Sequence, residues 1–427
     1  MKKLLLTVLM AVAGTLGAIC QLTLDSCIAR AQANYPLIVN YGLLDRTMGL
    51  ELSDVNKGWL PRIGLYAQGT AQNAVAAFPN ALKGLIDGTG HHIRGLGKEQ
   101  YKVGVELNQT IYDGGSAREQ RRVARADNAA QKARLDVELY SVRRRVQELY
   151  FGILLIDRQI EIARDTEKLL EAKLIDIKAK INDGVAMQAD ADMAEAQILT
   201  LKQQIAEAEA SCKAYCSALA LFTGVPVDED SLVVPNSEMP ETSYNLRPEL
   251  ALYEARKKAN DARLGSIDVS TMPRIGLFAQ GYYGYPGYNY FESMMNRKLS
   301  FNVLAGIKIS WNIDAFYTRP NARRKLSLAN ETIDAERNTF MLNNNIDMEM
   351  NRNTIEGLLN IMADDQRIVE LRTNVRRAAE ARLENGVIDT TDLLAKISDE
   401  NQARLNAQYH SIKLIQNIYD LKYIVNQ

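Results

Sequence analysis

The sequence predicts a mostly α-helical protein with a β-barrel contribution, built from a unit of two strands and one helical hairpin that occurs twice. Three observations predict this class. Nine residues, PRIGLYAQG at Pro61–Gly69, return with one difference as PRIGLFAQG at Pro273–Gly281. Apolar residues recur every three or four positions over long stretches, which is typical of coiled coils. Four shorter segments alternate apolar and polar residues, which is typical of strands with one apolar face.

The duplication extends beyond this motif. Gly104 corresponds to Gly306, and Gly184 to Gly386, each pair 202 residues apart. The copies of the Pro61 motif are instead 212 residues apart. The first copy therefore carries about ten extra residues between its two strands, as a surface-loop insertion would.

These matches divide the chain into four parts. We expect a signal peptide over residues 1–20, a first repeat over 21–232, a linker over 233–246 and a second repeat over 247–427.

The first 20 residues are typical of a secretory signal peptide, because Lys2 and Lys3 precede an apolar stretch that ends near Ile19. Cleavage before Gln21 would remove Cys20. Retention of Cys20 with a lipid is the alternative, although Ile19 fits a lipoprotein cleavage site poorly. After this stretch no segment has the roughly 18 apolar residues of a membrane-spanning helix, so any later membrane crossing must use strands.

Each repeat ends in a predicted helical hairpin, over about 116–222 in the first copy and about 320–427 in the second. An apolar period of 3.5 residues held this long specifies a left-handed coiled coil. A helix over 116–183 would be on the order of 100 Å long. The apolar seam of that helix includes Val146, Leu149, Ile153, Ile156 and Ile160.

Glycine marks the turn between the paired helices of each copy. Gly184 and Val185 form the predicted tip of the first hairpin, and Gly386 and Val387 form that of the second. Glycine at these positions suits a helix C-cap with positive φ, followed by a short turn into the next helix.

The four predicted strands lie at about 59–70, 101–112, 272–283 and 300–313. Each is near the roughly 9–11 residues that a tilted strand needs to cross a bilayer. Four strands are too few to close a barrel, and an open sheet edge in lipid leaves backbone groups without hydrogen-bond partners. Several copies of the chain must therefore share one barrel.

Aromatic and basic residues mark the strand ends. Trp59, Tyr112 and Trp311 lie at ends that would face the periplasm, where they suit an aromatic girdle at the membrane interface. The alternative is that these aromatic side chains pack inside a soluble β core. Arginines follow the second and fourth strands and either reach lipid phosphates or form a solvated helical face. They include Arg118, Arg121, Arg122, Arg319 and Arg323.

Composition excludes several function classes. The net charge of −1 and the isoelectric point near 6.4 argue against a nucleic-acid partner, which requires a strongly basic face. No metal or cofactor is predicted, because Cys212 and Cys216 are four residues apart in a helical pattern without a histidine companion. Cys212 is interpreted as packing on the apolar seam. His91, His92 and His410 accompany no catalytic motif, so no enzyme is predicted.

Several motifs occur in the order of a known family. After the signal peptide come LTLDSCIARAQANYP at Leu22–Pro36, WLPRIGLYAQG before a strand, LNQTIYDGG before a long helix, and the NDGV and ENGV turns. Their order and spacing show that the chain resembles the TolC-type outer-membrane efflux protein (outer membrane factor) family over essentially its whole mature length.

The resemblance implies a homotrimer whose twelve strands close one barrel in outer-membrane lipid. The hairpins would form a long coiled-coil α-barrel, a tunnel across the periplasm. The implied function is the exit duct of a tripartite efflux or type I secretion system, which passively conducts substrates from an inner-membrane transporter. In such proteins the hairpin tips, here Gly184, Val185, Gly386 and Val387, contact a periplasmic adaptor (membrane fusion) protein.

The resemblance also implies a closed periplasmic entrance. Asp190 and Asp392 follow the tips, and in a symmetric assembly carboxylates that point to the axis become rings of like charge that select for cations. The alternative is that these residues cap their helices, since Asp389 and Asp392 have the spacing of an N-cap and its acidic N3 partner.

A periplasmic coiled-coil adaptor or scaffold protein of an export complex is the alternative function. That class also combines a secretion signal, a helical hairpin and β segments, but it usually has a single hairpin. Two hairpins and four amphipathic strands favour the channel.

Overall fold

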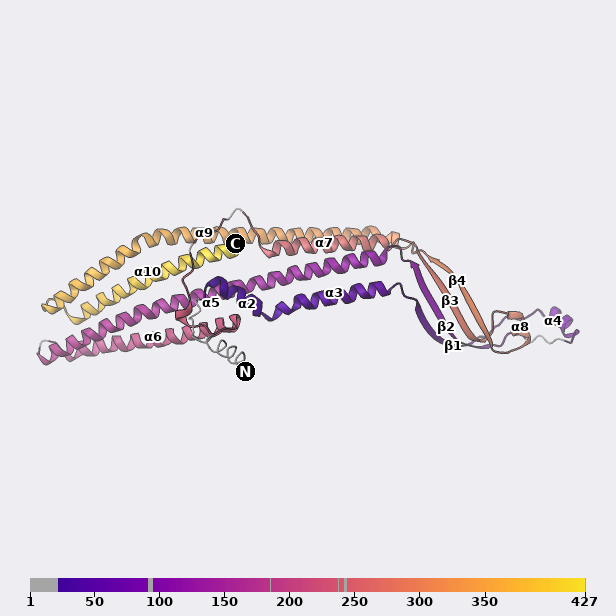
Figure 1. The fold of residues 1–427 in the computed structure, drawn as a ribbon, viewed down its shortest axis with the longest axis horizontal. Coiled ribbons are helices and arrows are strands. Elements are labelled where there is room, and N and C mark those ends of the chain that lie inside the picture. Colours follow the sequence, from indigo (N-terminus) through magenta and orange to yellow (C-terminus); the bar gives the residue numbers. More distant parts are fainter. Residues whose placement is uncertain (1–21, 91–94, 185, 237, 242–243, 427) are drawn as a thin grey trace, which may run out of the picture. The chain divides into compact units, whose positions relative to one another are not determined.

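A computed structural model describes residues 22–90, 95–184, 186–236, 238–241 and 244–426 (Figure 1). The predicted signal peptide, with Cys20, lies outside the described residues, as do Val185, His91 and His92. Within the described part of the chain, no helix combines the length and the apolar character that crossing a membrane requires.

The chain folds as two compact units, each built from segments distant in sequence. The first, here called the hairpin unit, contains the described residues up to Tyr41, residues 133–252 and the chain from Glu336 onward. The second, here called the sheet unit, contains residues 42–132 and 253–335. Each unit takes segments from both sequence repeats, so the repeats and the compact units divide the chain differently.

The sheet unit contains the strands, the helices that precede them and the start of both long helices. Its elements are most of α3 (Val39–Lys57), β1 (Arg62–Ala71), α4 (Asn80–Asp87), β2 (Glu99–Tyr112), most of α7 (Pro248–Val269), β3 (Arg274–Tyr285), α8 (Tyr290–Met295) and β4 (Ser300–Ser310).

The hairpin unit contains the remainder of both long helices and their partners. Its elements are α2 (Leu24–Asn34), the 3₁₀ turns η1 (Pro36–Ile38) and η2 (Glu229–Ser231), most of α5 (Ser116–Asn182), α6 (Gln188–Thr223), most of α9 (Ala315–Glu384) and α10 (Thr390–Val425).

The second hairpin begins earlier than the sequence predicts. Its first helix starts at Ala315, not at about 320, and Pro320 lies inside it. Pro320 is the sixth residue of α9, beyond the first four N–H groups that have no intrahelical partner, so the helix lacks one backbone hydrogen bond in its second turn. The sequence patterns also miss α3 and α7. No described residue of α3 is fully buried, but Leu44, Met48, Leu52 and Val55 are half-buried at helical spacing.

Two strand boundaries are also shifted. The first strand begins at Arg62, not at 59, because the Leu60 N–H still donates to the Lys57 carbonyl as a continuation of α3. The fourth strand ends at Ser310, not at 313. Trp59 and Trp311 therefore flank their strands and do not belong to them.

The four strands form one antiparallel sheet in the order β1–β2–β3–β4. Directly opposite residues of antiparallel neighbours share a face. Val105 lies opposite Leu65 on one side and opposite Gly281 on the other. Leu277, four residues before Gly281, lies opposite Ile307. The register therefore places the apolar positions of all four strands on one continuous face.

This apolar face is uncovered in the single chain. Leu65 is 83% exposed and Ile307 is 70% exposed. Among the described residues, β1 and β4 do not pair with each other, so each keeps one free edge. An exposed apolar face of this extent marks contact with lipid or with another protein, and free edges require pairing with another chain.

The opposite face explains two duplicated glycines. A Cβ on Gly104 would come within 2.7 Å of the Tyr282 Cβ. A Cβ on Gly306 would come within 2.9 Å of the Phe278 ring. The Phe278 ring of β3 thus covers Gly306, whereas the Gly281 carbonyl and the Tyr282 Cβ of β3 leave no room beside Gly104.

In the hairpin unit the long helices pair through apolar seams. Val146 and Ile153 of the predicted seam are fully buried in the core, together with Phe151. Leu219 of α6 and Tyr419 of α10 contribute to the same core. The core therefore joins helices of both hairpins.

The register generates a test of the two faces. Ile307→Asp places a charge on the apolar face and should reduce outer-membrane assembly, by a cost of about 2 kcal/mol near mid-bilayer. Lys308→Asp, one residue further and on the opposite face, should assemble normally. Heat-resistant oligomers in isolated outer membranes measure assembly, and equal assembly of the two variants would reject the face assignment.

Candidate functional site

Both hairpins end their first helix with a glycine in the left-handed backbone conformation. Gly184 has φ 74° and Gly386 has φ 68°, which confirms the predicted left-handed glycine caps. In the second tip the Gly386 N–H donates to the Leu383 carbonyl at 3.2 Å, and the Val387 N–H donates to the Arg382 carbonyl at 2.9 Å. These bonds satisfy the last carbonyls of α9 and reverse the chain within a few residues.

The tips present apolar side chains to their surroundings. Val387 is 68% exposed and Met187, at the start of the second helix of the first hairpin, is 76% exposed. A Cβ on Gly184 or Gly386 would meet nothing within 4 Å. Both described tips are therefore open for contact, and Val185 lies outside the described residues.

The two predicted gate aspartates differ in local structure. Asp190 reaches back to its helix start, where its Oδ2 accepts from the Met187 N–H at 2.9 Å. In the second hairpin the roles are reversed, because Asp389 Oδ1 accepts from the Asp392 N–H at 2.8 Å. The Asp392 side chain is exposed. The capping role is thus observed for Asp190 and Asp389, whereas Asp392 accepts no cap hydrogen bond.

The two hairpins of one chain share an apolar core near the tips. It includes Leu170 and Ile177 of α5, Ile198 of α6, Ala379 of α9 and Leu393 of α10, all less than 9% exposed. This core makes the tips of one chain a connected structure.

Polar contacts also tie the first hairpin to the second. Lys173 Nζ of α5 lies 3.4 Å from Glu380 Oε1 of α9, and both side chains are mostly buried. Lys180 Nζ donates to the Leu383 carbonyl at 3.3 Å, one turn before the second tip. Any relative movement of the two hairpins near their tips has to break these contacts.

A buried carboxylate anchors a wider charge cluster in the second hairpin. Glu400 of α10 is 4% exposed and pairs with Arg376 of α9. Arg404 lies 2.7 Å away, and the Thr373 hydroxyl donates at 2.9 Å. Burial alone would raise the Glu400 pKa, but the hydrogen bonds from Arg376 and Thr373 and the charges of Arg376 and Arg404 outweigh it, so the pKa lies below its usual value.

The three predicted interface aromatics lie at one end of the sheet. Trp59 precedes β1, Tyr112 ends β2 and Trp311 follows β4, and antiparallel pairing brings these ends together. Their exposed fractions are 41%, 45% and 57%. They are not packed inside a β core of this chain, and the Trp311 indole N–H donates to the Thr271 carbonyl at 2.9 Å. The interface role remains a prediction.

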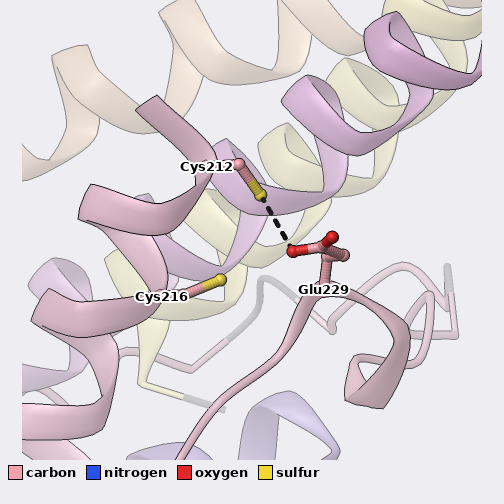
Figure 2. A group of neighbouring side chains, drawn as sticks. All are labelled: Cys212, Cys216 and Glu229. Carbon is pink, nitrogen blue, oxygen red and sulfur yellow. Dashed lines mark hydrogen bonds between the residues drawn. The ribbon is translucent and has the colours of Figure 1, made fainter. Parts of the chain in front are cut away.

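Sequence reasoning missed one group of side chains. Cys212 is buried, as predicted for a packing residue. Cys216 lies beside it, and the fold brings the Glu229 carboxylate to the same place (Figure 2). No spacing rule signals this group, because Glu229 arrives through a turn and an irregular segment after α6.

Part of the sequence and the whole fold are similar to known proteins. Residues 54–225 match the family model for outer membrane efflux proteins. Three solved channel structures share the fold with a TM-score of 0.65, each over 94% of this chain: OprN (16% identity, 89% of that chain), CmeC of Campylobacter jejuni (14%, 85%) and the open state of MtrE of Neisseria gonorrhoeae (17%, 88%). No curated protein sequence matches the chain.

Residues 54–225 are thus similar to outer membrane efflux proteins, and the chain shares the fold of the three channels. These similarities confirm the resemblance that the sequence motifs indicate, together with the predicted class of fold and the outer-membrane location. The family and the compared structures are channels and not enzymes.

The Glu400 cluster generates a stability prediction. Glu400→Gln removes the buried carboxylate that Arg376 and Arg404 share and leaves Arg376 with Glu380, 2.8 Å away, as its anionic partner. It should lower the free energy of unfolding by about 1–3 kcal/mol at neutral pH. Thermal denaturation measures the loss. Glu370→Gln is the matched control, because Glu370 forms an exposed ion pair with Arg367 in the same helix and should change stability by less than about 1 kcal/mol.

The same cluster has a pH signature. Because folding lowers the Glu400 pKa, the stability it contributes is present above its ordinary value of 4.5 and is lost as the pH falls through the folded-state value. The melting-temperature difference between wild type and Glu400→Gln should therefore shrink below about pH 4. A difference that stays constant down to pH about 3 contradicts this assignment.

Proposed function

We propose that this protein is the outer-membrane exit duct of an efflux or secretion system and that it works as a homotrimer. The observation that carries the proposal is the sheet register, which creates one continuous apolar face bounded by two free edges. Three copies supply twelve strands, a number that closes a membrane barrel, and closure pairs every edge.

The helical hairpins complete the duct on the periplasmic side. Helix α5 has 67 residues and α9 has 70, so each is on the order of 100 Å long. The exposed seam-like residues of α9 suit contact with neighbouring copies; they include Leu342, Ile346, Met350 and Leu359. Such helices form a tunnel wall when three copies assemble. Transport through the duct is passive, and an inner-membrane transporter supplies both substrate and energy.

The hairpin tips are the proposed contact with a periplasmic adaptor protein. Gly184, Val185, Gly386 and Val387 occupy the tips, and the exposed Met187 adds apolar surface beside them. An adaptor that binds both tips can move one hairpin relative to the other.

The gate is proposed to lie at the same end. The Lys173–Glu380 pair and the Lys180 bond to the Leu383 carbonyl hold the hairpins of one chain together in this structure. Asp392, repeated by the symmetry, contributes a ring of carboxylates at the entrance. The structure of MtrE is described as an open state, which supports an entrance that can open and close in this fold.

The second tip generates a prediction for export. Gly386→Val puts a β-branched residue at φ 68°, which costs about 1–2 kcal/mol locally and distorts the turn. Export should fall while trimers persist, because a side chain at this position meets nothing within 4 Å. Gly357→Val is the control, because it lies in open space within α9 and has no positive φ. Normal export by Gly386→Val would contradict a role for the tip geometry.

Planar-bilayer recordings test the duct and its gate together. The purified wild-type protein should conduct ions and prefer cations, and Asp392→Asn should weaken that preference about two-fold or more, because one carboxylate of the ring is lost from each copy. Asp364→Asn removes an equal charge from the middle of α9 and should leave selectivity unchanged. A wild-type protein without conductance would reject the duct, whereas unchanged selectivity in Asp392→Asn would reject only the gate role.

A further inference from the structure

Two buried thiols and one carboxylate converge in the hairpin unit (Figure 2). Cys212 and Cys216 lie one turn apart on α6, and Glu229 begins the 3₁₀ turn η2. The two Sγ atoms and a carboxylate oxygen all lie within 4.8 Å of one another, and Cys212 Sγ is 3.8 Å from Glu229 Oε2. Ligand atoms of a tetrahedral zinc ion are roughly 3.5–3.8 Å apart, so small side-chain rotations bring all three donors to one ion.

We propose that Cys212, Cys216 and Glu229 bind one thiophilic divalent cation, for which Zn²⁺ is the best match. Two thiolates and one carboxylate are a zinc donor set, and water from the adjoining cavity completes four-coordination. The sulfur donors exclude Mg²⁺ and Ca²⁺, which take oxygen ligands.

The backbone around Glu229 is held in place before any ion binds. Helix α6 stops at Gly224, whose φ is 71°. Beyond Glu229, the Ser231 carbonyl accepts from the Leu22 N–H at 2.8 Å, and the Tyr150 hydroxyl donates to the Val233 carbonyl at 2.6 Å. The segment that carries the carboxylate is therefore fixed on both sides of it, which lowers the cost of assembling the site.

The second repeat shows that packing alone does not require sulfur. Residues 202 positions after Cys212 and Cys216 are Leu414 and Ile418. Ile418 is 3% exposed, so an aliphatic side chain fills the equivalent buried position.

A cysteine thiol is ordinarily protonated at neutral pH, and the thiolate is the form that binds a metal ion. Binding breaks two S–H bonds, forms two bonds from sulfur to the ion and releases two protons to solvent. The liganded group then carries one net negative charge. A cavity of 630 Å³ adjoins the group and is lined by Arg164, Lys213, Glu209 and Asp228, of which Arg164 pairs with Glu209.

Co²⁺ binding to the full-length protein, purified in detergent and fully reduced, tests the proposal. We expect one Co²⁺ per chain with sulfur-to-cobalt charge-transfer absorption, release of two protons per ion, and displacement by Zn²⁺ but not by Mg²⁺. Zn²⁺ should also raise the melting temperature, since the ion ties the segment after α6 to that helix.

Matched variants distinguish the three proposed ligands from other residues near them. Cys212→Ser and Cys216→Ser should abolish the thiolate absorption, and Glu229→Gln should weaken binding about tenfold or more. Asp228→Asn changes another residue that lines the same cavity, and Cys27→Ser removes another buried thiol. Both variants should bind Co²⁺ with the affinity of the wild type. Because Glu229 is exposed, its variant keeps the test valid if the buried serine variants fold poorly.

Three results would overturn the proposal. The first is the absence of charge-transfer absorption in the reduced wild type. The second is equal affinity of Glu229→Gln and wild type. The third is a Cys212–Cys216 disulfide in the protein as isolated from membranes, detected by mass spectrometry.

Discussion

Backbone hydrogen bonding at the two free sheet edges is the constraint on which the rest of the structure depends. Water satisfies an exposed strand edge, but hydrocarbon does not. The register gives this sheet a continuous apolar face suited to lipid, so β1 and β4 cannot remain unpaired there. Assembly of several chains follows from this conflict. On the opposite face, the duplicated glycines Gly104 and Gly306 leave room for atoms of β3, the Phe278 ring in the case of Gly306.

In the hairpin unit the duplicated feature is the turn that joins the two paired helices of each hairpin. Long helices need a defined turn, and left-handed glycine supplies it at Gly184 and Gly386. The copies then diverge. Asp190 caps its helix from the third helical position, whereas Asp389 caps α10 as the N-cap residue before it, and the Asp392 carboxylate stays exposed. The two hairpins of one chain therefore differ, although both derive from the same duplicated unit.

Charged groups are concentrated where the two hairpins and their helices meet. Glu400 is buried and its carboxylate is stabilised by Arg376, Arg404 and Thr373. Breaking one partner of such a cluster is costly, although the net gain from forming it is modest. These contacts specify one arrangement of the helices more than they add stability. The Cys212 group has a similar place in the first hairpin, where it fixes the segment that leaves α6.

The sequence by itself determined the features that depend on neighbours in the chain. Alternation defined the strands and the lipid face, the apolar period defined the paired helices, and glycine defined the tips, because each follows from local backbone geometry. Only the tertiary structure decided which distant groups meet. Glu229 reaches the cysteines through an irregular segment, and Lys173 finds Glu380 on another helix. It also decided that α9 begins before Pro320. Such outcomes depend on long-range packing, which no local pattern records.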